Sequence, residues 1–292
     1  MTEVFRTPDE RFAGLPGFPY TPNYVDVGGL RLHHLDEGSG DTVVCFHGEP
    51  SWGFLYRHVV GFLVDAGHRV VCPDMVGFGR SDKPIDERWY TYDRHVETVA
   101  AHLDRLDLRD VTVVVQDWGG PIGLRWAVEN AERVARLVIL NTGLFAGRVS
   151  KGFMVWREFV EANPDLPIGA IIQAGTAAEL PDAVVAAYEA PYPTTKSKAA
   201  AHRFPFLVPL SDDDAGAAEM RAVRDALSRW DKPALVAFSD NDPVFPFPLA
   251  GQQFTDLIPT AGEQVRIADA AHFLQEEAAA QIVNAMAGAL QR

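Results

Sequence analysis

Short apolar runs alternate with segments of helical periodicity along most of this chain, and this alternation limits its fold more than any other feature. The runs are rich in β-branched residues and cover Thr42–Phe46, Arg69–Cys72, Val111–Val115, Arg136–Leu140, Ala234–Phe238 and Val265–Ile267. Continuous apolar runs of this length are typical of strands that are covered on both faces. Helical patterns accompany them at Leu55–Ala66, Val96–Leu106, Ile122–Val134 and Glu276–Leu290, and a hairpin is indicated at Tyr24–Val27 and Leu30–Leu35. Strands that alternate with helices predict β-α-β units and an α/β fold with a mainly parallel sheet.

The alternation stops between about Thr142 and Ala215. Prolines recur in this stretch, and short helical patterns occur near Phe153–Glu161 and Ala183–Tyr188. Because a plain loop of this length is uncommon in a compact domain, we expect an inserted helical cap. The alternative is a helical excursion of the main domain without a role as a lid. The predicted domains are a core of residues 1–142 and 214–292 and a cap of residues 143–213.

Composition excludes several classes of function. The 292 residues include 40 acidic and 26 basic side chains, for a net charge of −14, and such a surface repels nucleic acid and anionic lipid. The N-terminal residues lack the apolar segment of a secretory signal, and no uncharged apolar run reaches the ~20 residues of a membrane span. We therefore expect a cytoplasmic protein that does not contact membranes. We also expect a monomer. Cys45 and Cys72 lie in or beside apolar runs and are expected to be free thiols.

The strongest candidate for a catalytic group is Asp117, in the segment Val113–Gly120 (VVVQDWGG). A strand, a polar residue and a small residue that precede a helix are typical of a nucleophile elbow, although Val115 replaces the first glycine of the usual motif. A serine needs a base before it can attack, whereas an aspartate is already an anion at neutral pH. This property suits displacement at a saturated carbon. The alternative is that Asp117 only caps the helix that follows it.

Two further residues follow strands in the order that α/β-hydrolases use, which is nucleophile, acid and histidine. Asp242 follows the run that ends at Phe238, and His272 follows the run that ends at Ile267. The carboxyl ends of parallel strands are where active sites of open α/β sheets assemble. We therefore predict that Asp117, Asp242 and His272 form a catalytic triad. Asp240 is an alternative acid, but it lies closer to the strand.

The loop His47–Trp52 (HGEPSW) follows the first run of the predicted parallel sheet. In α/β-hydrolases the corresponding loop donates a backbone N–H to the oxyanion hole. We predict that the backbone N–H groups of Glu49 and Trp118 form this hole.

With these motifs the sequence resembles the haloalkane dehalogenases. The matching segments are HGEPSW, PDMVGFGRSDKP (Pro73–Pro84), VVVQDWGG, SDNDP (Ser239–Pro243) and AAHFLQEE (Ala270–Glu277). The resemblance covers nearly the whole chain and is greatest to the subgroup in which two tryptophans bind the halide. It implies an α/β-hydrolase fold, with a mostly parallel eight-stranded sheet flanked by helices and an inserted helical cap.

The resemblance also implies roles for the site residues. Asp117 would attack the carbon that bears the halogen and form an alkyl ester, and Trp118 and Trp156 would donate their indole N–H groups to the halide. His272 would activate water, Asp242 would orient His272, and the Glu49 carboxylate would help to position the water. The expected substrate is a small apolar haloalkane, and water is the second reactant. Other candidates for an apolar wall are Phe153, Phe159, Phe204, Phe206, Leu207, Val208 and Phe245.

Three alternative functions are left open by the sequence. An epoxide hydrolase shares the elbow aspartate and the triad but needs acidic groups in the cap, for which Tyr188 and Tyr192 are candidates. A haloacid-type dehalogenase needs arginines near the nucleophile, and Arg125 is the nearest along the helix. A non-catalytic binding protein of this fold would not need the complete triad.

No metal or other cofactor is expected, because a carboxylate and water are sufficient for this chemistry. His33, His34 and Asp36 are spaced closely enough to suggest a metal site. We expect them on a surface hairpin, without a metal.

Overall fold

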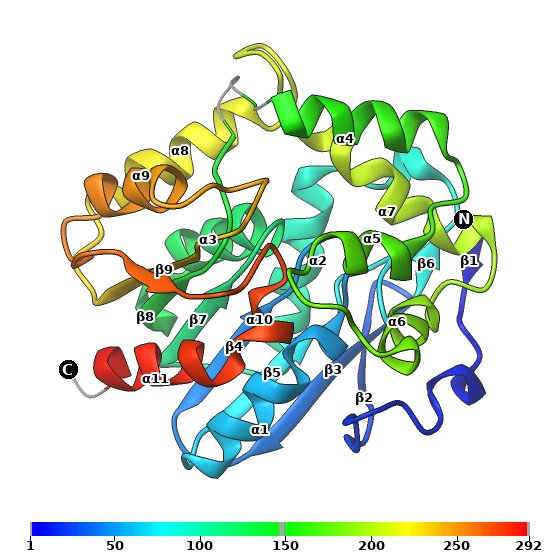
Figure 1. Cartoon of the computed structure of the whole chain (residues 1–292), viewed down its shortest axis with the longest axis horizontal. Coiled ribbons are helices and arrows are strands. Elements are labelled where there is room, and N and C mark those ends of the chain that lie inside the picture. The colour runs from blue at the N-terminus through cyan, green and yellow to red at the C-terminus, as the bar shows by residue number, and fades with distance from the viewer. Residues whose placement is uncertain (1, 146–148, 150, 291–292) are drawn as a thin grey trace.

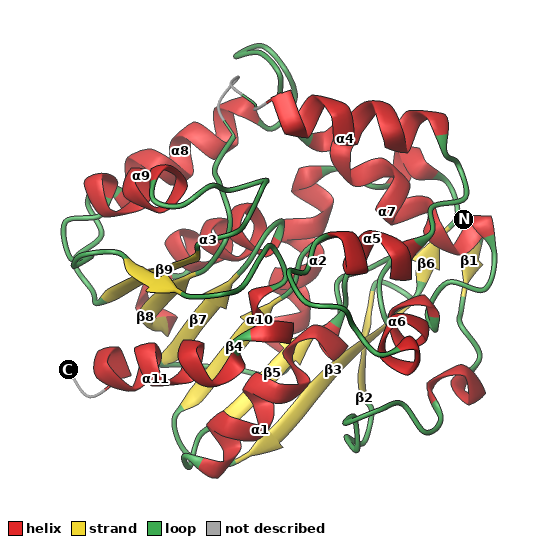
Figure 2. Cartoon of the chain, viewed as in Figure 1, coloured by secondary structure: helices red, strands yellow, loops and turns green. Residues whose placement is uncertain are grey.

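A computed structural model describes residues 2–145, 149 and 151–290. Its centre is an eight-stranded sheet with the strand order β10-β9-β8-β7-β4-β5-β3-β2. β2 pairs with β3 and β3 pairs with β5 in antiparallel fashion, and the other neighbours are parallel. Helices cover both faces of this sheet, which is the architecture of the α/β-hydrolase fold (Figure 1 and Figure 2).

The strands are β1 (Val4–Phe5), β2 (Asn23–Val27), β3 (Leu30–Gly38), β4 (Thr42–Phe46), β5 (Arg69–Pro73), β6 (Lys83–Pro84), β7 (Val111–Val115), β8 (Val134–Ile139), β9 (Ala234–Ser239) and β10 (Val265–Ile267). All six runs and the leading hairpin form strands, and the predicted bounds of β4, β7 and β10 agree with the structure. The pair of β1 and β6 was not predicted, because two residues are too few to produce a periodic pattern.

The helices are α1 (Arg57–Asp65), α2 (Tyr92–Arg105), α3 (Gly119–Glu129), α4 (Lys151–Ala162), α5 (Ile168–Ala174), α6 (Asp182–Glu189), α7 (Ala199–Arg203), α8 (Ala217–Leu227), α9 (Leu249–Leu257), α10 (Leu274–Glu277) and α11 (Ala279–Leu290). Short 3-10 segments are η1 (Asp9–Phe12), η2 (Gly53–Tyr56), η3 (Glu87–Trp89), η4 (Ala131–Arg133), η5 (Thr195–Lys198) and η6 (Phe204–Leu207). The predicted helical patterns correspond to α1, α2, α3, α4, α6 and α11, whereas α5, α7, α8 and α9 were not predicted. The helices α5 and α7 have too few turns to show a clear apolar stripe.

The buried strands contribute to two cores, one on each face of the sheet. Within β4, Val44 and Phe46 pack into the core formed with α2, α3 and α8, whereas Val43 and Cys45 pack into the core formed with α1 and α11. Successive side chains of a strand point to opposite faces, so one continuous apolar run serves both cores. Figure 1 shows α1 and α11 on one side of the sheet and α2 and α3 on the other. Cys45 and Cys72 are buried free thiols, as predicted.

The stretch in which the alternation stops contains helices α4 to α7. In Figure 1 they lie beside and above the carboxyl edge of the sheet, and α8 then returns the chain to α3 in the core. Residues 146–148 and 150 of the predicted cap lie outside the described residues. The division at residues 143 and 213 remains our interpretation of this arrangement.

Two predictions concern the surface of the molecule. None of the helices in the described part of the chain combines the length and the apolar character that crossing a bilayer requires. The prediction that His33 and His34 lie on a surface hairpin is wrong, because both are buried. His33 Nδ1 lies 2.7 Å from Asp74 Oδ2, and His34 Nδ1 lies 3.1 Å from His102 Nε2. The hairpin faces α2 and the loop after β5 in the folded chain, which local sequence could not reveal.

Candidate active site

Asp117 lies at a sharp turn between the end of β7 at Val115 and the start of α3 at Gly119. Its backbone has a φ of +49°, in the left-handed region that side chains other than glycine rarely adopt. The backbone N–H of Asp117 donates to the Asn141 carbonyl oxygen at 2.8 Å, and the Thr142 hydroxyl donates to the carbonyl oxygen of Asp117 at 2.5 Å. A Cβ atom at Gly119 would collide with the carbonyl oxygen of Phe46, which explains the glycine after Trp118. These contacts hold the aspartate at the carboxyl edge of the sheet.

The Asp117 side chain is directed to the loop that follows β4. Its Oδ1 atom accepts a hydrogen bond of 2.8 Å from the backbone N–H of Glu49. The residue at the N-cap position of α3 is Trp118, and no side-chain cap bond is formed there. The alternative in which Asp117 only caps the helix is therefore wrong. A Cβ atom at Gly48 would collide with the Asp117 carboxylate, so the loop approaches this closely only with a glycine at that position.

His272 lies between two carboxylates. Its Nε2 atom is 3.6 Å from Asp117 Oδ2, and its Nδ1 atom is 3.0 Å from Asp242 Oδ2. The other oxygen of Asp242 accepts hydrogen bonds from the backbone N–H groups of Val244 and Phe245, at 2.7 and 3.1 Å. Asp240, the alternative acid, instead pairs with Arg266. The structure thus brings Asp117, His272 and Asp242 together and leaves Asp240 outside this group.

The two carboxylates determine the charge of His272. Burial alone would lower the pKa of this histidine, but Asp242 and Asp117 outweigh burial and raise the pKa to about 10. At neutral pH the imidazole is therefore protonated. A change that removed the Asp117 charge would lower the pKa of His272.

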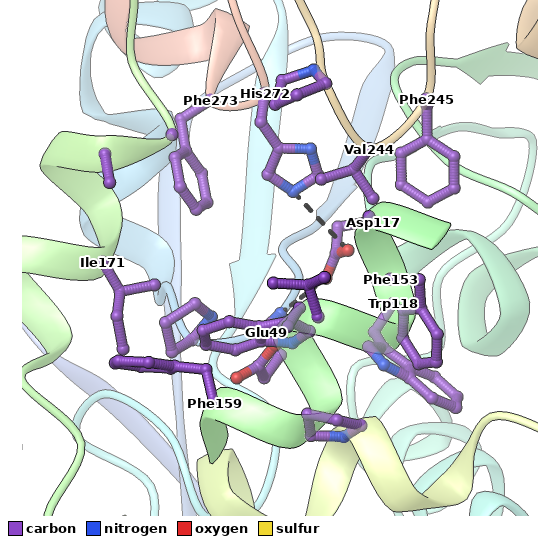
Figure 3. A pocket seen from close by; sticks show the side chains of 18 of the residues that line it. Glu49, Asp117, Trp118, Phe153, Phe159, Ile171, Val244, Phe245, His272 and Phe273 are labelled. Carbon is purple, nitrogen blue, oxygen red and sulfur yellow. Dashed lines mark hydrogen bonds and ion pairs between the residues drawn. The ribbon is translucent and has the colours of Figure 1, made fainter. Parts of the chain in front are cut away.

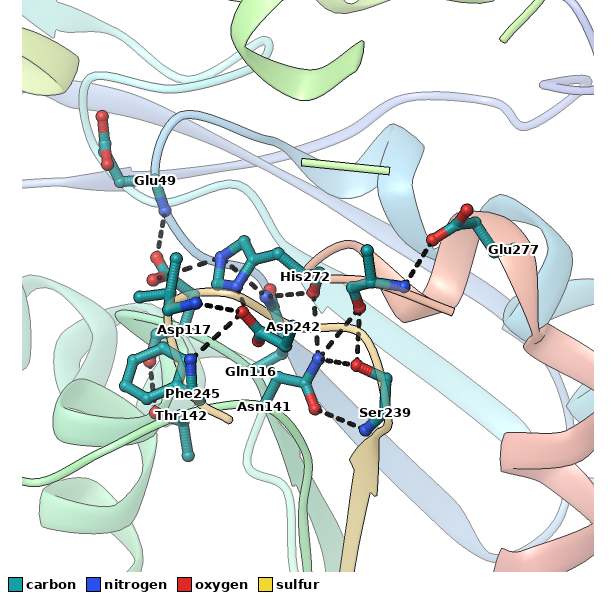
Figure 4. A network of polar contacts seen from close by, with 12 residues as sticks. Glu49, Gln116, Asp117, Asn141, Thr142, Ser239, Asp242, Phe245, His272 and Glu277 are labelled. Carbon is teal, nitrogen blue, oxygen red and sulfur yellow. Dashed lines mark hydrogen bonds and ion pairs between the residues drawn. The ribbon is translucent and has the colours of Figure 1, made fainter. Parts of the chain in front are cut away.

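The Glu49 side chain has a different environment from its backbone N–H. Figure 4 shows the N–H directed at Asp117 and the carboxyl group directed away from it. Burial, and then the negative charge of Asp117, hold the pKa of Glu49 well above its usual range, which favours the neutral acid. The sequence suggested a carboxylate at this position, whereas the structure favours a protonated carboxyl group.

A cavity of about 490 Å³ opens over Asp117 and His272. Asp117 lies between His272 and Glu49 at one side of the cavity, and aromatic and aliphatic side chains surround it (Figure 3). Trp118 and Trp156 both line this cavity. Trp118 packs edge-on against Phe204 at a centroid distance of 5.0 Å, and Trp156 stacks on Phe159 at 5.7 Å. A mainly apolar chamber with a few convergent polar groups is typical of a site for a small molecule.

The aromatic wall was predicted in part. Phe153, Phe159, Val208 and Phe245 line the cavity, whereas Phe204, Phe206 and Leu207 are not among its described lining residues. Other lining residues were not predicted, among them Phe145, Pro167, Ile171, Pro205, Val244 and Phe273. Phe273 follows His272 directly and Val244 follows the Asp242 loop, so proximity to the triad was the available signal.

A second group of residues missed from sequence supports the backbone of the histidine loop (Figure 4). Gln116 Nε2 donates to the His272 carbonyl oxygen at 3.1 Å. Asn141 Nδ2 and the Ser239 hydroxyl both donate to the Ala271 carbonyl oxygen, at 3.0 and 2.7 Å. Gln116, Asn141 and Ser239 each lie at the carboxyl end of β7, β8 or β9, so their position beside the strand ends was a signal.

The polar cap residues considered for other functions are engaged elsewhere. Tyr188 donates to Glu276 Oε2 at 2.6 Å, and Tyr192 donates to the Pro50 carbonyl oxygen at 3.3 Å. Neither tyrosine is among the described residues that line the cavity. Arg125 pairs with Asp93 and Glu129 instead of Asp117. Within the described residues, no group of three His, Cys, Asp or Glu side chains could hold a metal ion.

This sheet, with an aspartate at the elbow and an acid–histidine pair at neighbouring strand ends, defines an α/β hydrolase. The family model described as the alpha/beta hydrolase fold matches residues 41–279. The chain is 46% identical to haloalkane dehalogenase 1 of Mycobacterium bovis and 44% identical to a haloalkane dehalogenase of Mycobacterium marinum. The alignment with the Mycobacterium bovis protein covers 97% of this chain and 97% of the relative. The alignment with the Mycobacterium marinum protein covers 96% of this chain and 97% of the relative.

A solved structure is also very similar. It is that of the haloalkane dehalogenase DpaA from Paraglaciecola agarilytica NO2, described as tetrameric, with a TM-score of 0.93, 35% identity and coverage of 98% of each chain. The chain belongs to the haloalkane dehalogenases of the α/β-hydrolase fold.

Proposed function

We propose that this chain hydrolyses the carbon–halogen bond of a small apolar haloalkane through an ester on Asp117. The products are an alcohol, a halide ion and a proton. The observation that carries the proposal is the Asp117 carboxylate, which lines a largely apolar cavity within 3.6 Å of His272. An anion in this position can attack a saturated carbon without prior removal of a proton.

In the first step, Asp117 Oδ2 attacks the carbon that bears the halogen. The new C–O bond forms as the carbon–halogen bond breaks, and the electron pair of that bond leaves with the halide. Trp118 and Trp156 donate their indole N–H groups to the halide. An indole has one donor on a largely apolar body, so two of them can stabilise an anion without burying a counter-charge. The position of both side chains in the cavity wall supports this role.

In the second step, water attacks the ester carbonyl of Asp117. Ester formation neutralises the carboxylate that helps to keep the pKa of His272 high, so the imidazolium can then lose its proton. The neutral imidazole takes a proton from the attacking water, while Asp242 orients the ring and stabilises the imidazolium that results. Collapse of the tetrahedral intermediate releases the alcohol and restores the Asp117 carboxylate.

The backbone N–H groups of Glu49 and Trp118 stabilise the oxyanion of that intermediate. The Glu49 N–H already donates to Asp117 Oδ1 at 2.8 Å, a distance suited to this role. The role of the Trp118 N–H is proposed from its place directly after the nucleophile. The neutral carboxyl group of Glu49, which also lines the cavity, can hydrogen-bond the incoming water.

The proposal is tested by comparing two substrates with the same purified protein. We expect bromide release from 1,2-dibromoethane and no diol from styrene oxide, because opening an epoxide needs an acid above the nucleophile and Tyr188 and Tyr192 are bound elsewhere. Bromide is measured with an ion-selective electrode and diol by chromatography. Diol formation without bromide release would instead indicate an epoxide hydrolase, and neither product would indicate a binding protein of this fold.

The substitution Trp156→Phe tests the halide site. It removes one charge-assisted hydrogen bond of about 1.5–3 kcal/mol, so we expect bromide to bind at least about tenfold more weakly. The measurement is the concentration of added bromide that halves the steady-state rate. Trp89→Phe is the matched control, because Trp89 is half-buried in η3 and is not among the described lining residues. An unchanged bromide affinity in the Trp156 variant would contradict the role of Trp156.

The remaining proposals concern the setting of this site. We propose that residues 143–213 form the cap that encloses the substrate, since α4 and α5 contribute lining residues. A monomeric state and a cytoplasmic location remain predictions for this chain.

A further inference from the structure

We propose that Glu277 is a positioning residue for His272, because its single carboxylate joins the histidine loop to the turn after α5, residues 175–178, next to the part of α5 that lines the cavity. This inference rests on the proposed function, in which His272 activates water in the second step. Glu277 is the last residue of α10 and is not among the described residues that line the cavity. Its effect on the reaction would therefore pass through the backbone around His272.

The Glu277 carboxylate accepts three backbone hydrogen bonds from two separate parts of the chain. Its Oε2 atom accepts from the N–H of Ala271, the residue before His272, at 2.8 Å (Figure 4). Its Oε1 atom accepts from the N–H groups of Ala177 and Ala178, between α5 and α6, at 2.7 and 2.8 Å. A carboxylate has enough lone pairs for all three bonds, and bonds to an ionised acceptor are stronger than neutral ones.

The residue after His272 is attached to the same segment. The Phe273 N–H donates to the Gly175 carbonyl oxygen at 3.3 Å. The Phe273 ring lies so close to Gly175 that a Cβ atom there would overlap it, and both residues line the cavity. The residues on both sides of His272 are thus bound to residues 175–178.

The core of the molecule holds the opposite side of the histidine loop. Gln116, Asn141 and Ser239 bind the carbonyl oxygens of residues 271 and 272, whereas Glu277 and Gly175 bind the N–H groups of residues 271 and 273. Loss of the Glu277 carboxylate would leave the carbonyl bonds in place but release one N–H group beside the histidine. A displacement of about 1 Å in a catalytic group can reduce a rate by about 100-fold.

The effect should be confined to one step of the reaction. Ester formation depends on Asp117 and on the indoles that receive the halide, and the histidine has no bond to make or break in that step. Ester hydrolysis depends on the position of His272 relative to the ester. A Glu277 variant should therefore slow hydrolysis and preserve the rate of ester formation. A general loss of folded protein would instead reduce the yield of both steps equally.

The test variant is Glu277→Gln, which keeps the size of the side chain. Its amide has one oxygen, and its NH₂ group would face N–H donors, so it cannot accept from both parts of the chain. Glu277→Asp is a second variant, since a carboxylate that is shorter by one methylene cannot span both parts. The matched control is Tyr188→Phe, which removes a hydrogen bond between the cap and Glu276, the residue before Glu277.

Each protein is mixed rapidly with 1,2-dibromoethane, quenched with acid and analysed by mass spectrometry for the alkyl ester. We expect both Glu277 variants to hydrolyse the ester about tenfold more slowly, with ester formation within about twofold of the unsubstituted protein. Since kcat/KM reports the steps up to carbon–halogen cleavage, we expect kcat and KM to fall together and kcat/KM to hold. Tyr188→Phe should keep both rates.

The outcomes separate this inference from the proposed function. If the unsubstituted protein releases no bromide, the proposed function fails. If the unsubstituted protein turns over and the Glu277 variants keep its ratio of ester hydrolysis rate to ester formation rate, Glu277 does not position His272. Equal slowing of ester hydrolysis in Tyr188→Phe would also overturn the inference, because any weakened contact between cap and core would then have the same effect.

Discussion

Asp117→Ala should release no bromide from 1,2-dibromoethane above the rate of the reaction without protein. The methyl group of alanine cannot attack carbon, and the remaining groups of the site cannot form the ester. Removal of a covalent nucleophile lowers turnover by at least about 10⁴-fold in comparable enzymes. Bromide release is measured at a protein concentration above the detection limit of the bromide assay, so that even one equivalent would be seen. Mass spectrometry then shows that no alkyl group is attached to the protein.

The matched control for this variant is Asp110→Ala. Asp110 is exposed and has a φ of +52°, so the same substitution is made in nearly the same backbone conformation, away from the cavity. We expect Asp110→Ala to change the melting temperature about as much as Asp117→Ala does and to keep full activity. The loss of activity in Asp117→Ala would then come from the missing nucleophile and not from the altered backbone. Repeated turnover by Asp117→Ala would contradict the proposed mechanism.

His272→Ala should release about one equivalent of bromide per protein and then stop or continue very slowly. Asp117 can still form the ester, but no base activates the water, and loss of a general base slows a step by about 10²–10⁴-fold. The trapped alkyl-enzyme should be detectable by mass spectrometry on a peptide that contains Asp117. His58→Ala, a change of an exposed histidine in α1, should turn over normally. Many equivalents of bromide at the rate of the unsubstituted protein would exclude His272 as the base.

The pH dependence of ester hydrolysis gives a second measurement on the same variant. With the carboxylates intact the pKa of His272 is about 10, and ester formation lowers it by removing the Asp117 charge. Protonated imidazole cannot act as a base, so the hydrolysis rate of the unsubstituted protein should rise with pH until the histidine of the ester form has lost its proton, and then level off. In His272→Ala this rise should be absent.

The close agreement between sequence and structure in the centre of the fold has a local cause. The runs that became β4 and β7 are continuous and apolar because both of their faces are buried, and this property is visible in five residues. The edge strand β10 is shorter, and its middle residue Arg266 is exposed. The elbow was predictable for a related reason, since Asp117 and Gly119 have to follow β7 directly. The order of Asp117, Asp242 and His272 then indicated the class of enzyme, because each follows a strand whose carboxyl end faces the same edge of the sheet.

The charge states at the site could not be predicted from sequence. Burial and the charge of Asp117 raise the pKa of Glu49, and the carboxylates Asp242 and Asp117 raise the pKa of His272 against the effect of burial. Glu49 and His272 and the two carboxylates that act on them follow four different strands of the sheet. The same reason explains the error at His33 and His34, whose partners Asp74 and His102 are distant in the chain.

By itself, the sequence determined the eight strands of the central sheet, the elbow and the candidates for the reacting groups, because each depends on residues that are adjacent in the chain. Only the tertiary structure decided that Asp242 and not Asp240 reaches the histidine, that Tyr188 and Tyr192 bond to Glu276 and Pro50, and that Glu277 binds residues 177 and 178. These relations depend on the order of strands in the sheet and on how the inserted helices pack against it. Local patterns of hydrophobicity carry no information about such distant contacts.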